Sequence, residues 1–416
     1  MADVNITLVH TNKGATTDKK GLFTLKVRSN NDTLQFSMLG YSTLKLSVLE
    51  LKDKNYTVVL PEKVEGLSEV ELKGKRKLRE NLKYDKLTSL KQSIFDFGAC
   101  VVNNKIYIVG GDETSNTDVA KKAVRKANEM ISDLDDLLYQ MRRHNEFSWK
   151  GYSKKIQVYD IGKGEWTDTL KLVHNRAYHN LNYHNNTLFA LGGKRISTNG
   201  RFEYLNETID VINLDSLSVK VDRTNPHQAI NFTSVVYKDH LVVLGGSYKK
   251  SSQGKELYPD GVHVYNFNSG LWYELTKMPY PKEVNGVVVG DKIYLIGGYN
   301  GQELSTIETF DLVTGIWQTI GQLPIAIKRP ALAVNGNDIY IYNNGTMMVY
   351  DTKKNILTNY HLNLQLQDAG MHCYNDTLYL IGGYEETDYS KRPSPNIYTI
   401  ELSEFLKTKS TVSKID

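Results

Sequence analysis

Residues 292–298 read KIYLIGG, a short apolar run that ends in two glycines. The pattern recurs as IYIVGG, LFALGG, LVVLGG and LYLIGG, and a degenerate copy reads IYIYNNG. The first glycine of each pair, or the asparagine that replaces it, stands at positions 110, 192, 245, 297, 343 and 382. A unit that recurs at such spacings along one chain indicates a repeat architecture.

Each copy is flanked by further strand-like runs. A strand and a tight turn of Asn, Asp, Gly or Lys residues come before it, and such residues suit the positive φ of two-residue hairpins. A third strand follows each copy, as in IQVYDI or VHVYNF. A fourth is marked by Trp166, Trp272, Trp317, Val219 and Leu357 in five units. Small four-stranded sheets bury their faces by radial stacking, so the sequence predicts a closed ring of six, a six-bladed β-propeller.

The sixth unit has no clear fourth strand of its own. Tyr84 precedes Asp96 by 12 residues, the same spacing that separates the fourth-strand Trp from the next unit elsewhere. We therefore predict that residues 84–90 complete the last blade, which would clasp the two ends of the ring together.

The double glycine, the Tyr before it and the downstream Trp resemble the Kelch repeat over residues 84–402. The resemblance implies an all-β, six-bladed Kelch-type propeller, which we place at 84–406. It also implies that the point fourteen residues before each glycine lies at the mouth of the central channel.

Residues 1–72 alternate polar and apolar side chains with period two, which predicts a small β-sandwich. This segment resembles the carboxypeptidase-regulatory-like (transthyretin-like) domain of exported Gram-negative proteins. The matching residues are Gly14, Thr17, Asp18, Gly21, Phe23, Asp32, Thr33, Leu34, Gly40, Tyr41, Leu67, Ser68, Glu69 and Val70. The resemblance implies a spacer or docking role, an exported protein in the periplasm or at the outer-membrane surface, and a partner there.

Charge and composition exclude several classes of function. The net charge of +4 is concentrated at residues 73–83, which we interpret as a basic linker. A nucleic-acid-binding domain would instead spread a basic face, so no nucleic-acid partner is expected. No apolar run is long enough for a transmembrane segment. Cys100 and Cys373 stand alone inside strands and the histidines lack metal spacing, so neither a metal nor a cofactor is expected.

The loops between the second and third strands are long in four units, at 112–155, 194–207, 247–260 and 384–395. These loops share one face of the ring, which is where binding residues usually gather. Within the first loop, residues 117–143 carry one apolar stripe at helical spacing and predict a helical insert. The insert is interpreted either as a lid or partner-docking helix, or as a helix packed on the propeller's own rim.

Six residues occupy the channel-mouth positions and form the candidate ligand-binding ring. They are Asp96, Tyr178, Asn231, Glu283, Arg329 and Asp368. Asp96 and Asp368 belong to neighbouring blades, where their proximity would raise one pKa or hold a cation. Polar residues at a solvated mouth also need no function.

Most of the 27 tyrosines fall at repeat positions inside strands, which indicates a place in the core. Others lie in or beside the long loops and are candidates for ligand contact. Those are Tyr204, Tyr248, Tyr258, Tyr299 and Tyr384.

Three functions remain open at this point. The first is a non-catalytic propeller that binds a glycan or a protein through the loop-rich face. The second is an enzyme resembling the sialic-acid mutarotase-like Kelch proteins, with Glu283 as base, Arg329 as carboxylate clamp and Asp96 as acid. The third is a structural assembly platform that works through the helical insert.

Overall fold

The computed structural model describes residues 1–11, 13–62, 78–118, 121, 150–172, 174–216, 218–250 and 256–414. Strands make up 53% of the chain and helices 4%, which confirms the all-β class. The chain divides into two compact units, Met1–Arg76 and Lys77–Asp416. Nearly all of the expected insert at 117–143 lies outside the described residues. Within the described ranges, no helix has the length and apolarity to span a membrane.

The N-terminal unit is built on one antiparallel sheet in the order β2-β1-β3-β4. Its elements are β1 (Asn5–Leu8), β2 (Gly14–Thr16), β3 (Thr33–Ser37), β4 (Leu44–Ser47) and α1 (Val48–Asp53). Alternate side chains of β1 and β3 are buried, so Ile6 and Phe36 lie in the core at 0% and 1% exposure. This alternation is the period-two pattern of the sequence.

A second layer covers this sheet, and part of the segment expected to complete the sandwich, 63–77, lies outside the described residues. Among the described residues, α1 and the segments around Phe23 and Val58 pack against the sheet, and 56–61 forms no strand. The helix begins at Ser47, whose side chain accepts from the Glu50 N–H while the Glu50 carboxylate accepts from the Ser47 N–H. This capping box satisfies two backbone donors and favours a helix directly after β4.

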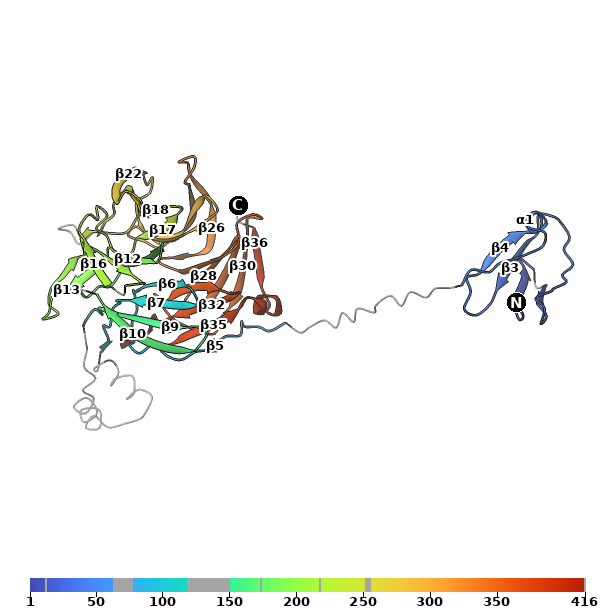
Figure 1. The fold of residues 1–416 in the computed structure, drawn as a ribbon, viewed down its shortest axis with the longest axis horizontal. Helices are drawn as coiled ribbons and strands as arrows, with labels where there is room; N and C mark the ends of the chain where they lie inside the picture. Colours follow the sequence, from blue (N-terminus) through green and yellow to red (C-terminus); the bar gives the residue numbers. More distant parts are fainter. Residues whose placement is uncertain are drawn as a thin grey trace, which may run out of the picture. The chain divides into compact units, whose positions relative to one another are not determined.

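The second unit holds six sheets of four or five strands within the described residues (Figure 1). Blade 1 consists of β6 (Gly98–Val102), β7 (Lys105–Val109), β9 (Lys155–Asp160) and β10 (Glu165–Lys171). Blade 2 consists of β11 (Asn180–His184), β12 (Thr187–Leu191), β15 (Ile209–Asn213) and β16 (Ser218–Asp222). Blade 3 consists of β17 (Thr233–Tyr237), β18 (His240–Leu244), β21 (Gly261–Asn266) and β22 (Leu271–Lys277).

The remaining sheets continue the ring. Blade 4 consists of β23 (Glu283–Val289), β24 (Lys292–Tyr299), β25 (Leu304–Asp311) and β26 (Trp317–Ile327). Blade 5 consists of β27 (Ala331–Asn335), β28 (Asp338–Asn343), β29 (Thr346–Asp351), β30 (Ile356–His361) and β36 (Thr411–Lys414). Blade 6 consists of β31 (Gly370–Tyr374), β32 (Thr377–Ile381), β35 (Ile397–Glu401) and β5 (Asp85–Lys86). The innermost strands contact one another in the order β6, β11, β17, β23, β27, β31 and back to β6, so the ring is closed.

Small extra sheets extend the long loops on one face. They are β13 (Lys194–Ile196) with β14 (Glu203–Leu205), β19 (Lys249–Lys250) with β20 (Glu256–Leu257), and β33 (Tyr384–Thr387) with β34 (Ser390–Pro393) and β8 (Asn116–Thr117). The last of these joins the loop of blade 6 to the loop of blade 1.

The clasp predicted at residues 84–90 is confirmed. Lys86 and Asp85 of β5 pair with Tyr398 and Thr399 of β35, and the Leu90 N–H donates to the carbonyl of Pro395. An N-terminal segment therefore supplies the outer strand of the last blade.

The ring also includes residues outside the expected bounds of 84–406. Strand β36 pairs with β30 as a fifth strand of blade 5, and it is preceded by a 3-10 helix, η1 (Leu402–Lys407). Leu82, from the expected linker, is buried at 2% exposure among the side chains of blades 5 and 6. The Arg79 N–H donates to the carbonyl of Lys407, and the Lys409 N–H donates to that of Arg79. The expected linker thus ends several residues before Tyr84.

The double glycines allow the close approach of backbone segments at the channel mouth. Gly297 and Gly298 have φ values of 64° and 120°, which an L side chain rarely adopts. A Cβ on Gly297 would stand 2.4 Å from the carbonyl oxygen of Ile327, and one on Gly298 would stand 2.7 Å from that of Glu283. Gly297 therefore lets the segment that leads into blade 5 lie against the end of β24, and Gly298 does the same for the start of β23.

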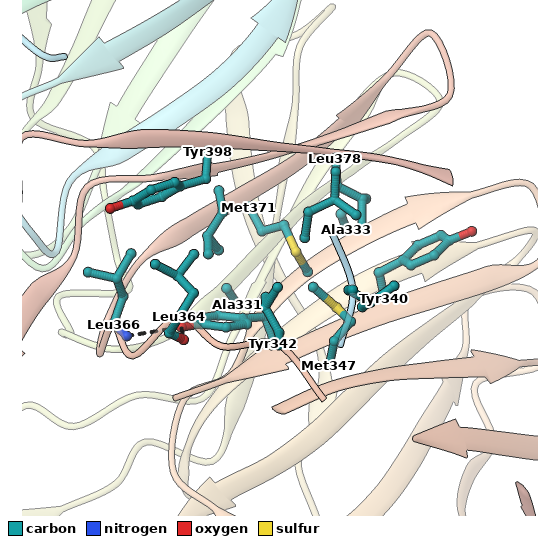
Figure 2. Close-up of a cluster of buried hydrophobic side chains, with 14 of the residues drawn as sticks. Ala331, Ala333, Tyr340, Tyr342, Met347, Leu364, Leu366, Met371, Leu378 and Tyr398 are labelled. Atoms are coloured by element: carbon teal, nitrogen blue, oxygen red, sulfur yellow. Dashed lines mark hydrogen bonds between the residues drawn. The ribbon is translucent and has the colours of Figure 1, made fainter. Parts of the chain in front are cut away.

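Apolar side chains fill the space between neighbouring blades. Figure 2 shows the cluster between blades 5 and 6, where Met347, Met371 and Leu378 are almost fully buried. The Tyr342 hydroxyl lies in this core at the centre of two hydrogen bonds, because it donates to the Leu364 carbonyl at 2.6 Å and accepts from the Leu366 N–H at 2.9 Å. Tyr342 thus contributes both to core packing and to the hydrogen bonding of the backbone.

Candidate functional site

The candidate ring residues stand where the chain enters the innermost strands. Asp96, Tyr178, Asn231 and Asp368 have positive φ values of 48°, 59°, 55° and 47°. Non-glycine residues in this conformation are uncommon and cluster at functional or tightly constrained sites. The same backbone turn therefore recurs at the start of four blades, and all four residues line the channel mouth.

Two cavities meet at this ring. The channel cavity has a volume of about 540 Å³ and runs between the innermost strands. The mouth cavity has a volume of about 410 Å³ and opens among the loops. Both are lined by Asp96, Tyr178, Asn231, Arg329 and Asp368, whereas Glu283 lines neither.

Arg329 spans the boundary between the two cavities. Its Nη2 lies 2.6 Å from Oδ1 of Asp96 and 2.6 Å from Oδ1 of Asp368, and its Nη1 donates to Oδ1 of Asn231. The guanidinium from blade 5 therefore binds blades 1, 6 and 3 at once. The sequence left open whether Asp96 and Asp368 hold a cation, and in the structure Arg329 supplies that charge.

The electrostatics of this cluster follow from burial. The Asp96 side chain is 5% exposed, and burial raises its pKa to about 7, while Arg329 opposes the rise and Asp368 adds to it. Burial alone would lower the pKa of Arg329, but the Asp368 and Asp96 carboxylates raise it above its ordinary value. The raised pKa expected for one of the two neighbouring aspartates is thus assigned to Asp96.

Glu283 belongs to a different set of contacts. Its side chain is 1% exposed, and its Oε1 accepts from the Ser247 hydroxyl at 2.7 Å. Lys328 forms an ion pair with its Oε2 at 3.2 Å and lies 4.0 Å from the centre of the Tyr299 ring. Glu283 thus ties blade 4 to the loop of blade 3 and to the entry of blade 5.

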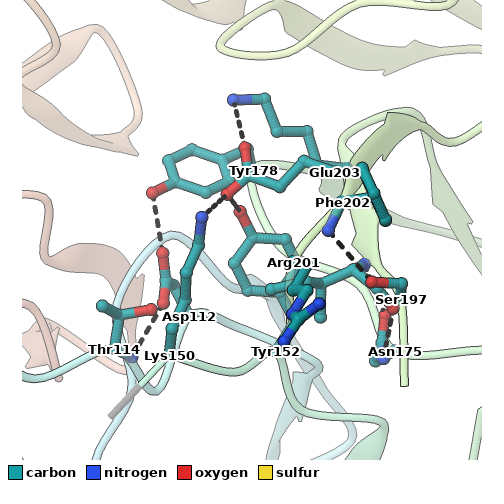
Figure 3. A network of polar contacts seen from close by, with 12 residues as sticks. Asp112, Thr114, Lys150, Tyr152, Asn175, Tyr178, Ser197, Arg201, Phe202 and Glu203 are labelled. Atoms are coloured by element: carbon teal, nitrogen blue, oxygen red, sulfur yellow. Dashed lines mark hydrogen bonds and ion pairs between the residues drawn. The ribbon is translucent and has the colours of Figure 1, made fainter. Parts of the chain in front are cut away.

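The Tyr178 side chain belongs to a polar network formed by the loops of blades 1 and 2 (Figure 3). Its hydroxyl donates to Oδ2 of Asp112 at 2.7 Å, and its ring packs edge-on against Tyr152. The Tyr152 hydroxyl in turn donates to Oε1 of Glu203 at 3.0 Å, and Lys194 lies over the Tyr178 ring. The network joins the loops of blades 1 and 2.

The five loop tyrosines lie in different surroundings. Tyr204 and Tyr248 are exposed at 45% and 44%. The Tyr258 hydroxyl donates to Glu256, and Tyr299 lies half-buried beneath Lys328. Tyr384 is buried at 8%, where its hydroxyl donates to Gln367 and Lys391 lies 3.7 Å from its ring centre. The structure therefore leaves two of the five well exposed to solvent.

Sequence reasoning missed a set of buried polar pairs at the entries of blades 2 to 4. Arg176 and Asp210, both with 0% side-chain exposure, are joined at 3.0 Å, and Arg176 also donates to the Gly192 carbonyl. Lys282 pairs with Glu308 at 2.6 Å in blade 4.

The equivalent place in blade 3 holds two histidines. His227 Nδ1 lies 3.0 Å from Nδ1 of His263, its Nε2 bonds the Gly245 carbonyl, and burial lowers its pKa to about 4. A signal for these pairs was present in the sequence. The third strands IDVIN, VHVYN and IETFD each carry a polar residue at the second quoted position, and these residues are Asp210, His263 and Glu308.

The geometry does not favour the mutarotase-like assignment of the ring. The Arg329 guanidinium is already bound by Asp96, Asp368 and Asn231, so it offers no free fork for a substrate carboxylate. Glu283 is buried away from both cavities. Among the described residues, no group of three His, Cys, Asp or Glu side chains is placed to hold a metal. The ring instead forms a polar surface beneath the mouth cavity, made of Arg329, Asp96, Asp368 and Asn231, which we call the floor of the mouth.

Comparisons with known proteins agree with this architecture. Residues 145–345 match the KLHDC2/KLHL20/DRC7 Kelch-repeats domain, and residues 1–72 match the CarboxypepD_reg-like domain. The chain carries a Kelch propeller. The predicted Kelch repeats and the predicted carboxypeptidase-regulatory-like domain are thereby confirmed.

This chain aligns with only part of the length of its curated Kelch relatives. Kelch-like protein 41b of Danio rerio is 27% identical over 58% of this chain and 34% of its own length. Kelch repeat and BTB domain-containing protein 2 of cowpox virus is 26% identical over 36% of this chain and 26% of its own length. The chain thus spans about a third or less of these two relatives. The solved structure of YjhT aligns over 79% of this chain and 99% of its own with a TM-score of 0.58 at 12% identity, which shows the fold alone.

Proposed function

We propose that the Kelch propeller is a binding module that recognises a partner protein on the face around the mouth of its central channel. Kelch domains typically mediate protein binding. The observation that carries the proposal is the Arg329 bridge, which lies between the channel cavity and the mouth cavity. It gives the mouth a rigid floor, and the elaborated loops form its walls.

The floor is organised before any partner arrives. Arg329 bonds Asp96, Asp368 and Asn231 and so joins four blades. Groups that are already held in place lose little conformational entropy on binding. A rigid scaffold that presents loops on one face is the usual arrangement of a binding protein.

The rim of the mouth supplies side chains for recognition. The exposed Glu303 of blade 4 and the half-buried Lys391 of blade 6 both line the mouth cavity, together with Asn343 and Asn344 of blade 5. The Lys391 ammonium lies over an aromatic ring, 3.7 Å from the centre of Tyr384. Opposite charges and amide groups on one rim suit a polar protein surface better than an apolar one.

The remaining parts of the hypothesis are proposals as well. We propose that the protein is exported to the periplasm or outer-membrane surface, with the N-terminal domain as spacer or docking unit. A glycan ligand and an assembly role for the insert at 117–143 are the alternatives. Cell fractionation with an antibody against the chain tests the location, and a periplasmic or surface fraction is the expected result.

The proposed function is tested by changing the mouth rim without touching its floor. Glu303→Lys reverses one exposed charge in the mouth cavity, and Glu274→Lys makes the same change on the outer strand of blade 3. Proteins captured by the immobilised full chain are quantified by mass spectrometry. We expect at least one protein to be captured about tenfold less by Glu303→Lys and undiminished by Glu274→Lys.

Two results would count against the proposal. One is capture that both variants retain equally, which would move the binding surface away from the mouth. The other is a glycan array in which a glycan binds the wild-type chain and loses binding on Glu303→Lys while no captured protein responds.

A further inference from the structure

The hairpin β13–β14 of blade 2 carries an unusual density of cationic and aromatic side chains. We define the blade-2 hairpin patch as Lys150, Lys194, Arg195, Arg201, Phe202 and Tyr204, with Glu203 at its centre. Phe202 is 58% exposed and Tyr204 is 45% exposed. Large exposed aromatic side chains beside arginines are typical of protein-binding hot spots.

The charge of this patch is one-sided. Glu203 is its one carboxylate among the described residues, and it is shared by Lys150 at 2.8 Å and Lys194 at 3.3 Å. The carboxylate of nearby Asp112 is buried and accepts from the Tyr178 hydroxyl. Four cations thus face one carboxylate. Burial pushes the pKa of Glu203 up, but the hydrogen bond from Lys150 and the charge of Lys194 lower it below its ordinary value.

Two of the four cations are presented outward. Arg195 is exposed and its guanidinium lies 4.9 Å from the centre of the Tyr204 ring, which holds its long side chain in place. Arg201 is exposed at the turn, where its backbone N–H donates to Asn199. Neither guanidinium has a carboxylate partner among the described residues. Figure 3 shows Arg201 and Phe202 next to the Glu203 network that anchors the hairpin to blade 1.

We infer that the blade-2 hairpin patch docks an acidic, extended segment of a partner protein. Carboxylates of such a segment would pair with Arg195 and Arg201 through the planar fork of the guanidinium. An apolar side chain of the segment would cover Phe202, and burial of that exposed surface adds a non-ionic contribution. The inference rests on the proposed function and names the chemistry of the partner.

A second loop on the same face argues for a short protein segment over a nucleic acid. The hairpin β33–β34 of blade 6 extends from the same face and exposes Glu385 and Glu386. These carboxylates lie opposite Arg392 and Lys391 in the strand register, so the blade-6 hairpin offers a long polyanion no excess of cations. A short acidic peptide would span the blade-2 hairpin alone.

The test uses the full chain and a fluorescein-labelled peptide of sequence EEEELEEE, measured by fluorescence anisotropy at low salt. Arg195→Glu with Arg201→Glu should weaken binding about tenfold or more, because two attractions become repulsions. Phe202→Ala should weaken it about fivefold. The control variant carries Lys163→Glu and Lys220→Glu, two exposed lysines away from the hairpin, and should change binding by less than about twofold.

Several outcomes overturn the inference. Equal loss of binding in the double variant and in the control would show only a general charge effect. Tighter binding of a single-stranded oligothymidylate of the same charge, with the same loss in the double variant, would assign the patch to nucleic acid. If the peptide fails while a captured protein still responds to Glu303→Lys, the hairpin inference falls and the proposed function stands.

Discussion

The buried carboxylate of Asp96 should make the propeller less stable as pH rises towards neutrality. Its folded-state pKa is raised from 3.8 to about 7, chiefly by burial. Between these two values the folded protein keeps the proton while the unfolded chain releases it. Stability therefore falls as pH rises from about 4 to about 7 and is level above that range.

The size of the effect follows from the shift. Each pKa unit corresponds to about 1.4 kcal/mol, so the contribution across this range is on the order of 4 kcal/mol. The Asp96 side chain is 5% exposed, so solvent screens it little. Replacing Asp96 with Asn keeps an oxygen that accepts from Arg329 and removes the titration.

The assay is urea unfolding of wild type and Asp96→Asn from pH 4.5 to 8.5. Tryptophan fluorescence reports the propeller alone, because all four tryptophans follow residue 83. Other groups, such as the buried His227, contribute slopes of their own and cancel in the difference. We expect the stability of Asp96→Asn minus that of wild type to rise by several kcal/mol up to pH 7 and then to level off. Glu274→Gln on the outer strand is the control.

A difference that stays constant with pH would refute this reasoning. It would mean that Asp96 is ionised throughout and that the Arg329 bridge outweighs burial. A difference that falls with pH would reverse the sign and place the folded-state pKa below 3.8.

Two further predictions concern stability. Arg176→Met should lower the free energy of unfolding by about 3–5 kcal/mol, because it leaves the Asp210 carboxylate buried without a partner. Adding Asp210→Leu to this variant should restore part of the lost stability. Denaturant unfolding measures both effects. Deletion of residues 1–76 should leave the melting temperature of the propeller within about 2 °C of that of the full chain. Deletion of residues 1–83 should lower the melting temperature by several degrees, because it removes Leu82 from the core. Equal melting temperatures for the two truncations would contradict the assignment of Leu82 to the ring.

Local signals account for what the sequence predicted correctly. The turn at Asn103 and Asn104 has φ values of 48° and 61°, as its residue types indicated. Trp166 lies in the fourth strand of its blade and packs on Tyr159, as its spacing indicated. These features depend on neighbours within one repeat, so the repeat register is enough to place them.

Features that depend on distant partners were not predictable in the same way. Strand β36 pairs with β30 across about fifty residues, and no turn signature or repeat position marks it. The ring register placed Arg329 and Asp96 at the mouth, but their contact joins residues 233 apart along the chain. The reach of a side chain across a channel is decided by packing in three dimensions.

The closure of blade 6 has a consequence for how a cell makes this protein. Strand β5 leaves the ribosome long before β35, with which it pairs, because about 300 residues separate them. At about 5–20 residues per second, β5 waits roughly 15–60 s for its partner. Until then each nascent chain exposes an open sheet edge that other chains can pair with. Slower translation of the last hundred residues would therefore increase aggregation without changing the finished protein.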